Sequence, residues 1–204
     1  EAEPALQVLA IVGPTAAGKT ALSIELAERF SAEIVNLDAF QIYRGMDIGT
    51  AKPTPAEQSR VRHHLIDIFD IDHNATVMEF EQLAAAAISD INLRGKLAIC
   101  VGGSGFYLRT VLDELDLPPT EPVVRAKFEA RLAELGAEQL HAELAKLDPT
   151  AAKLIPVGNS RRVVRALEVI ELTGRGYQAE LPAPLPRYRD LRIGLRVPRD
   201  VLAT

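Results

Sequence analysis

The sequence predicts an α/β protein in which a parallel sheet carries helices on both faces and an all-helical domain is inserted before the last strand. Two observations support the sheet: apolar runs typical of buried strands alternate with helical patterns, and glycine-rich turns join them. A third supports the insertion, because residues 123–173 show helical periodicity alone. We therefore expect an α/β core at residues 1–118, a helical insertion at 119–186 and a return strand to the core within 187–204.

The core elements follow from local patterns in the first hundred residues. Val8–Val12 is an apolar run that predicts the first strand, and Thr20–Phe30 has the apolar spacing of a helix. Ala32–Leu37 predicts a second strand that ends at Asp38. Residues 44–75 are rich in Gly, Pro, Asp and His, so we expect long loops with little regular structure.

The next helix has a sequence signature at each end. Thr76-Val-Met-Glu79 has the form of a capping box, in which the Thr76 hydroxyl and the Glu79 carboxylate both satisfy N–H groups. The helix is expected to stop at Gly95. Leu97–Val101 then predicts a third strand, which leads through Gly102-Gly103-Ser104-Gly105 into a short helix.

The insertion consists of helical patterns that end before a last strand. These patterns cover Val123–Leu135, Ala137–Leu147, Ala151–Leu154 and Ser160–Thr173. Gly174 closes the last of them, and a Pro-rich stretch follows at Leu181–Pro186. Leu191–Leu195 predicts the strand that returns to the core.

Composition excludes several classes of protein. With 204 residues, 48% hydrophobic and 25% charged, the chain is ordinary for a globular protein, and no apolar run approaches the roughly 20 residues of a membrane span. The net charge of −5 argues against non-specific coating of nucleic acid but allows a local basic patch. Cys100 is expected to be a buried thiol in a reducing cytoplasm. His63 and His64 lack further ligands, so we expect a structural role in a loop rather than a metal site.

A phosphate-binding pattern, G-x-x-x-x-G-K-[ST], lies between the first strand and the first helix. Its residues are Gly13, Pro14, Thr15, Ala16, Ala17, Gly18, Lys19 and Thr20. Such a turn directs backbone N–H groups and a helix N-terminus at an anion, while Lys19 bridges phosphate oxygens and Thr20 reaches a Mg²⁺ ion. The pattern predicts a diphosphate or triphosphate site on a P-loop NTPase-like fold; a chance glycine turn is the alternative.

Two further segments are expected at the same edge of the sheet, where open parallel sheets bind ligands. Asp38 follows the second strand, and its carboxylate could hold Mg²⁺, accept a proton from a nucleophile, or simply serve as a turn residue. The turn Gly102–Gly105 could bring backbone N–H groups and the Ser104 hydroxyl to a phosphate or a base, or it could be a tight turn without a ligand. We expect both segments and the phosphate loop to meet in one crevice.

Three arginines in the last predicted helix of the insertion are candidate RNA contacts. With Val163, Leu167 and Ile170 on the buried stripe, Arg161 and Arg165 are predicted on the opposite, exposed face and Arg162 on its flank. They could contact RNA phosphates, or they could form a solvated charged face.

Five segments in order, taken together, point to one family. They are Gly13–Thr20, Asp38–Pro53, His63–Asp67, Val101–Tyr107 and Arg161–Glu168. The phosphate loop is shared by many proteins, whereas the Asp38–Pro53 block is far more specific. Over nearly its whole length the chain resembles the tRNA dimethylallyltransferase (tRNA isopentenyltransferase) family.

The resemblance implies a function. Members of this family transfer a dimethylallyl group from dimethylallyl diphosphate to the exocyclic N6 amine of an adenine next to the anticodon of tRNA. The loop usually associated with ATP would then hold a prenyl diphosphate. The implied partners are the tRNA anticodon stem-loop and dimethylallyl diphosphate, with Mg²⁺ as the cofactor, and we expect a cytoplasmic monomer that contacts no membrane. Because the family continues beyond the last strand, the chain is expected to lack a C-terminal part.

The resemblance also assigns roles to residues. Asp38 would accept the proton that the amine loses, and Lys19 and Ser104 would act near the diphosphate. The implied tRNA contacts are Asp38, Ala39, Phe40, Gln41, Ser104, Arg125, Arg161, Arg162 and Arg165. In three places the chain departs from common family residues: Ala39 stands where serine is common, Ser104 where threonine is, and Arg161 where glutamine is.

Three other functions remain open. A P-loop nucleotide kinase would bind ATP and a phosphoryl acceptor, which the Asp38–Pro53 block argues against. An adenylate isopentenyltransferase would prenylate a free nucleotide and would not need a helical insertion with arginines. A non-catalytic RNA-binding module would bind tRNA or diphosphate without turnover.

Overall fold

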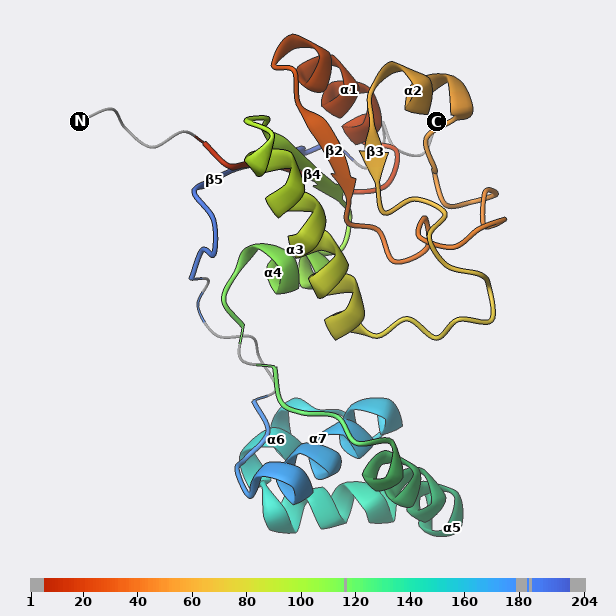
Figure 1. Ribbon diagram of the computed structural model, residues 1–204. Coiled ribbons are helices and arrows are strands. Elements are labelled where there is room, and N and C mark those ends of the chain that lie inside the picture. Colours follow the sequence, from red (N-terminus) through yellow and green to blue (C-terminus); the bar gives the residue numbers. More distant parts are fainter. Residues whose placement is uncertain (1–5, 116, 179–182, 184, 199–204) are drawn as a thin grey trace, which may run out of the picture. The chain divides into compact units, whose positions relative to one another are not determined.

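The computed structural model describes residues 6–115, 117–178, 183 and 185–198 of the chain, which divides into two compact units (Figure 1). Unit 1 comprises residues 1–115 and 184–204, and unit 2 comprises residues 116–183. The divisions fall three residues before each of the predicted boundaries, 118/119 and 186/187. Of the Pro-rich stretch, residues 181, 182 and 184 lie outside the described residues, as do 199–204 of the predicted return segment.

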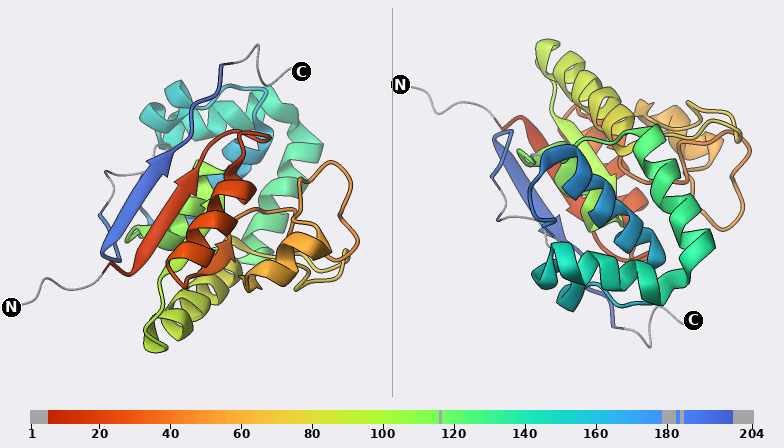
Figure 2. Two further views of the ribbon diagram at one scale, coloured as in Figure 1. Left: turned by 90° about the horizontal axis from the view of Figure 1, so that it is seen from above. Right: turned by 90° about the horizontal axis from the view of Figure 1, so that it is seen from below.

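Unit 1 is the predicted α/β core. Its elements are β1 (Val8–Val12), α1 (Lys19–Arg29), β2 (Glu33–Asn36), α2 (Pro55–Arg60), β3 (His63–His64), α3 (Val77–Leu93), β4 (Ala98–Gly102), α4 (Gly105–Leu112) and β5 (Asp190–Gly194). The described strands pair in parallel in the order β3-β2-β4-β1-β5. Figure 2 shows β5, the strand that returns after the insertion, beside β1 at the edge of the sheet.

Helices cover both faces of this sheet, as predicted. Alternate residues of β1 point to opposite faces, so Val8 and Ala10 belong to one core and Leu9 and Ile11 to the other. The first core is completed by apolar residues of α3 and α4, and the second by apolar residues of α1. Cys100 lies in the first core with no disulfide, which confirms the predicted buried thiol.

Residues 44–75 contain more regular structure than the sequence predicts. Helix α2 begins at a complete capping box, in which Thr54 accepts from the backbone N–H of Glu57 and the Glu57 carboxylate accepts from that of Thr54. The expected box at Thr76 forms by half: Thr76 accepts from the Glu79 N–H, but the Glu79 carboxylate contacts His73 at 2.9 Å instead. Strand β3 was missed because its two residues are defined by pairing with β2, which no local pattern reveals.

A buried carboxylate, Glu33, lies at the start of β2 with its side chain 4% exposed. Arg94 forms a bidentate pair with it, Lys96 donates to Oε1 at 3.0 Å, and His64 Nε2 lies 2.8 Å from Oε2. Hydrogen bonds from Arg94 hold the pKa of Glu33 well below its usual range; burial opposes this shift, and His64 and Lys96 add to it. These contacts tie β2 to β3 and to the chain between α3 and β4.

Unit 2 is all helical, as predicted, and contains α5 (Pro122–Leu147), α6 (Pro149–Leu154) and α7 (Ser160–Thr173). Gly136 in α5 has φ 81° and ψ 167°, so the two helices predicted on either side of it are confirmed as separate segments. Helix α7 packs on α5, and its buried stripe contains Val163 and Leu167, as expected. Gly174 ends α7 in the left-handed conformation that favours glycine.

We predict that Glu33→Gln lowers the free energy of unfolding at pH 7 by about 1–3 kcal/mol, because partly exposed cations lose a buried anionic partner. A carboxyl with a depressed native pKa stabilises the fold above its unfolded pKa of about 4.3, and this contribution is lost as the pH falls. The difference between wild type and variant should therefore shrink below about pH 5. Urea unfolding between pH 3 and 7 measures it. Glu28→Gln, which removes an exposed pair with Arg60, is the control; equal effects of the two variants would contradict the prediction.

Candidate functional site

The phosphate loop joins β1 to α1 in unit 1, as predicted. Ala16 (φ 64°) and Gly18 (φ 81°) adopt left-handed backbone conformations, which turn the chain sharply before the helix begins at Lys19. No side chain caps the N-terminus of α1. The loop therefore has the geometry of an anion-binding turn followed by an open helix N-terminus.

The Lys19 side chain is hydrogen-bonded to the backbone of this loop. Its Nζ donates to the carbonyl oxygens of Gly13 at 3.0 Å and Pro14 at 2.7 Å. Burial lowers the pKa of Lys19, and the negative charge of Asp38 opposes this shift. A bound anion would offer Lys19 stronger, charge-assisted hydrogen bonds than these two neutral carbonyls do.

Asp38 begins the turn that follows β2. Its Oδ1 accepts hydrogen bonds from the backbone N–H groups of Phe40 at 2.9 Å and Gln41 at 3.3 Å. The predicted structural role as a turn residue is therefore real, but it occupies one carboxylate oxygen. The other oxygen remains able to accept a proton or to contact a cation.

The glycine turn after β4 lies against both of these segments. A Cβ at Gly102 would lie 2.6 Å from the carbonyl oxygen of Leu37, so the residue before Asp38 requires glycine there. A Cβ at Gly103 would lie 3.4 Å from the Gly13 oxygen and 3.8 Å from Lys19 Nζ. Ser104 precedes α4 without using its hydroxyl as a helix cap.

These three segments line one cleft of about 320 Å³, as the sequence predicts. Of the candidate site residues, it is lined by Thr15, Ala16, Gly18, Lys19, Thr20, Asp38 and Gln41, together with Gly102 and Gly103. Gly13, Pro14, Ala17, Ala39, Phe40 and Ser104 are not among its lining residues. Phe40 is nevertheless 60% exposed beside Asp38 and Gln41, which leaves its ring accessible to a ligand.

Sequence reasoning missed part of the cleft wall, which also includes Asn36, Thr50, Ala51, Pro53, Glu57 and His63. His63 belongs to β3 rather than to a loop, and its Nδ1 lies 2.8 Å from the carbonyl oxygen of Val61. Its buried Nε2 has no hydrogen-bond partner, and burial lowers its pKa, with the Val61 carbonyl opposing. The segment His63–Asp67 is among those that point to the family, but only the pairing of β3 with β2 brings His63 to the cleft, which no local pattern predicts.

The expected exposed face of α7 is partly wrong. Arg161 is exposed, but the Arg165 side chain is 23% exposed and donates to the carbonyl oxygens of Pro118 at 2.7 Å and Pro119 at 2.9 Å. Arg162 is half-buried. Arg165 is partly buried because it pairs with an acidic residue one turn further along the helix, whose burial the helical projection does not predict.

That acidic residue is Glu168, which is fully buried and accepts from two of the predicted RNA contacts. Arg165 Nη1 and Arg125 Nη2 each lie 2.8 Å from its Oε2, and the Glu121 N–H donates to Oε1 at 3.0 Å. Burial raises the pKa of Glu168, but hydrogen bonds from Arg165 and then Arg125 outweigh it and hold the pKa below its usual value. Arg125 and Arg165 thus join α5, α7 and the segment before α5.

Two negative findings apply to the part of the chain that the structure describes. No group of three or more His, Cys, Asp and Glu side chains gathers as a metal site. None of the helices there has both the length and the apolar character needed to cross a membrane.

A phosphate loop after the first strand of a parallel sheet, with the carboxylate that follows β2 in the same cleft, defines a protein of the P-loop class. Residues 41–204 match the family model described as IPP transferase. The chain therefore belongs to the IPP transferase family, as the sequence predicts.

Similar proteins agree with this assignment. The tRNA dimethylallyltransferases of Salinispora arenicola (54% identity over 92% of this chain) and Thermobifida fusca (52% over 96%) are curated relatives, of which the chain covers 55% and 63%. The solved tRNA isopentenylpyrophosphate transferase of Bacillus halodurans is 44% identical over 96% of this chain and 61% of its own, with a TM-score of 0.61. A eukaryotic dimethylallyltransferase described as acting on tRNA is 29% identical, with a TM-score of 0.78 over 94% of this chain and 48% of its own.

We predict that Lys19→Met weakens the binding of inorganic diphosphate at least tenfold, because a charge-assisted hydrogen bond of about 1.5–3 kcal/mol is lost. Isothermal titration calorimetry measures the affinity. Lys127→Met, which removes a lysine paired with Glu171 in unit 2, is the control. Unchanged affinity in the Lys19 variant would show that the loop does not bind this anion.

Proposed function

We propose that the protein transfers a dimethylallyl group from dimethylallyl diphosphate to the N6 amine of an adenine next to the anticodon of tRNA. The observation that carries this proposal is the presence of the phosphate loop and Asp38 in one cleft of a chain that belongs to the IPP transferase family. The names of the similar proteins support the same reaction.

The phosphate loop would hold the diphosphate. Lys19 would exchange its bonds to the Gly13 and Pro14 carbonyls for bonds to phosphate oxygens. As the bond between the allylic carbon and the diphosphate oxygen breaks, negative charge gathers on the leaving group. Loop N–H groups and Lys19 are placed to stabilise this charge where it develops.

The residues present fit a Mg²⁺ ion. The Thr20 hydroxyl, which lines the cleft, is a hard oxygen ligand, and Mg²⁺ often combines one or two protein oxygens with substrate phosphates and water. Thr20 would be the principal protein ligand, as expected from the loop pattern. When bound, the ion would add positive charge beside the leaving diphosphate.

Asp38 would act as the proton acceptor. The adenine N6 atom forms a bond to the allylic carbon, and the proton that it loses passes to the carboxylate oxygen that is not used by the Phe40 and Gln41 N–H groups. Those two bonds fix the orientation of the carboxyl group. The adenine must leave its stack to reach the cleft, as for other enzymes that act on a base.

The tRNA would be bound by the segment Asp38–Gln41 and by exposed cations of unit 2. Arg161 is the arginine of α7 that we retain as a phosphate contact, because its side chain is exposed. The bonds of Arg125 and Arg165 to Glu168 support a structural role for both within unit 2. We also propose that the protein is a monomer and that it is located in the cytoplasm, where tRNA is found.

We predict that Asp38→Asn lowers the transfer rate by about 10²-fold or more, because the general base is lost. Asparagine retains an Oδ1 that can accept from Phe40 and Gln41, so the turn and diphosphate binding should persist. The assay uses labelled dimethylallyl diphosphate, Mg²⁺ and unmodified tRNA, with AMP and ATP as alternative acceptors. Equal loss of transfer and of diphosphate binding would contradict the general-base role.

The same assay separates the alternatives. Label on a tRNA adenine supports the proposal, and label on free AMP would identify an adenylate isopentenyltransferase. Phosphoryl transfer from ATP would identify a kinase. Binding of RNA and diphosphate by the wild type with no transfer would favour a non-catalytic RNA-binding module.

We predict that Arg161→Ala reduces the slope of log affinity for tRNA against log salt concentration by about 1, because one phosphate contact is lost. Arg165→Ala should instead lower the melting temperature, since Glu168 loses a partner and the Pro118 and Pro119 carbonyls lose their donor. Filter binding at several salt concentrations and thermal unfolding measure the two effects. An unchanged salt slope in the Arg161 variant would make that arginine part of a plain solvated face.

A further inference from the structure

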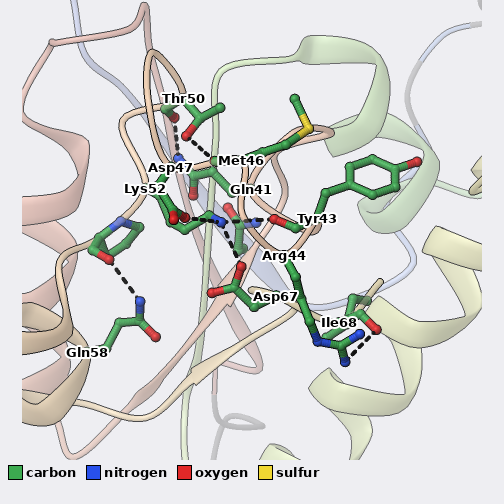
Figure 3. A network of polar contacts seen from close by, with 12 residues as sticks. Gln41, Tyr43, Arg44, Met46, Asp47, Thr50, Lys52, Gln58, Asp67 and Ile68 are labelled. Carbon is green, nitrogen blue, oxygen red and sulfur yellow. Dashed lines mark hydrogen bonds and ion pairs between the residues drawn. The ribbon is translucent and has the colours of Figure 1, made fainter. Parts of the chain in front are cut away.

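Lys52 belongs to a polar network beside the cleft, and only 5% of its side chain is exposed. Its Nζ donates to Asp67 Oδ1 at 2.6 Å, to Asp47 Oδ1 at 2.7 Å and to the carbonyl oxygen of Tyr43 at 2.9 Å (Figure 3). An ammonium group has three N–H donors, so each of them has a partner.

A buried ammonium is a costly way to stabilise a fold. Burial disfavours the charged form of Lys52, but the hydrogen bonds that it donates to Asp47 and Asp67 outweigh this effect and raise its pKa. The side chains of Asp47 and Asp67 are 67% and 41% exposed, so water screens both ion pairs and their contribution to stability is small. The geometry that Lys52 imposes on its neighbours is therefore of more interest than its contribution to stability.

Lys52 joins segments whose backbone conformations need support. Gly45, Gly49, Ala51 and Asp67 all have positive φ values, and for Ala51 and Asp67 these are 52° and 54°. Non-glycine residues in this region persist when surrounding contacts hold them. Lys52 supplies such a contact to Asp67 through the hydrogen bond to its Oδ1.

The side chain of Gln41 is hydrogen-bonded to the turn at residues 50–52, of which Lys52 is the last residue. Its Nε2 donates to the backbone carbonyl oxygens of Thr50 at 2.9 Å and Ala51 at 3.1 Å. Its backbone carbonyl oxygen accepts from the Asp67 N–H at 3.2 Å. Both hydrogens of the Gln41 amide are thus used within the protein. Its remaining side-chain polar atom is Oε1, which accepts hydrogen bonds and cannot donate them.

We propose that Lys52 is a positioning residue for RNA-base recognition, which holds the turn at residues 50–52 so that Gln41 presents an acceptor to the cleft. This inference rests on the proposed function, because it assumes that an RNA base enters the cleft that Gln41 lines. It adds to that function a direction of hydrogen bonding. Gln41 selects a base edge that carries an amino group, as adenine does, over an edge that carries a carbonyl oxygen, as hypoxanthine does.

The first test compares the binding of two anticodon stem-loop RNAs that differ in one base. One carries adenosine at the target position and the other inosine, and a second pair makes the same replacement at the neighbouring base. Wild type should prefer adenosine about tenfold at one of these positions, because a carbonyl facing Oε1 leaves two acceptors opposed. In Lys52→Met this preference should fall to near unity, since the turn that orients Gln41 is released.

Asp67→Asn is the second variant, because it removes the negative charge from the ion pair between Lys52 and Asp67. Asparagine tolerates a left-handed backbone as aspartate does, so the local chain path should be retained. It should reduce the preference in the same way, and the two substitutions combined should do little more than either alone. Arg60→Gln, which removes an exposed pair with Glu28 in the same unit, is the matched control and should leave the preference intact.

Steady-state kinetics provide the readout that a merely structural role would not produce. Lys52→Met should raise KM for the stem-loop or lower kcat, with KM for dimethylallyl diphosphate close to wild type, and Lys52→Arg should recover part of the loss by retaining the charge. No preference in wild type, or an unchanged preference in Lys52→Met, would overturn the inference. If wild type neither binds nor modifies the adenosine RNA, the proposed function fails instead.

Discussion

The close approach of three backbone segments at one edge of the sheet determines the rest of the site. Gly102 of β4 pairs with Val12 of β1, and the Leu37 N–H donates to the Val101 carbonyl at 2.8 Å. The three segments that follow β1, β2 and β4 therefore leave the sheet side by side. The absence of a side chain at Gly102 allows the Leu37 carbonyl to pack there. As a result, the residues that follow these strands, including Asp38, reach one cleft.

Buried charge serves different purposes in the two units. In unit 1, Glu33 ties β2 to β3 and to the chain between α3 and β4, while Lys52 holds a loop beside the cleft. In unit 2, Glu168 uses arginines that would otherwise be available to an RNA. The number of arginines on a helix therefore overestimates how many are free to contact RNA when a buried acidic residue lies one turn away.

The similarity to known proteins extends over both units of the chain. The family model matches most of the chain, including the loop that Lys52 stabilises and the helix that carries Glu168. The chain spans about 55–63% of the length of the first two curated relatives that it matches. The described residues of unit 1 provide a phosphate loop, a carboxylate and a hydrogen-bonded loop that line one cleft.

The sequence alone determined the α/β core, the helical insertion, the phosphate loop and the position of Asp38, because each depends on patterns within a few neighbouring residues. The strand β3, the cleft-lining His63 and the pairing of Arg165 with Glu168 were decided by tertiary structure. Strand pairing and ion pairing join residues that are distant in sequence or on unforeseen faces of a helix. A charge pattern cannot show whether an arginine faces solvent or a buried acid, because that choice is made only when the helices pack.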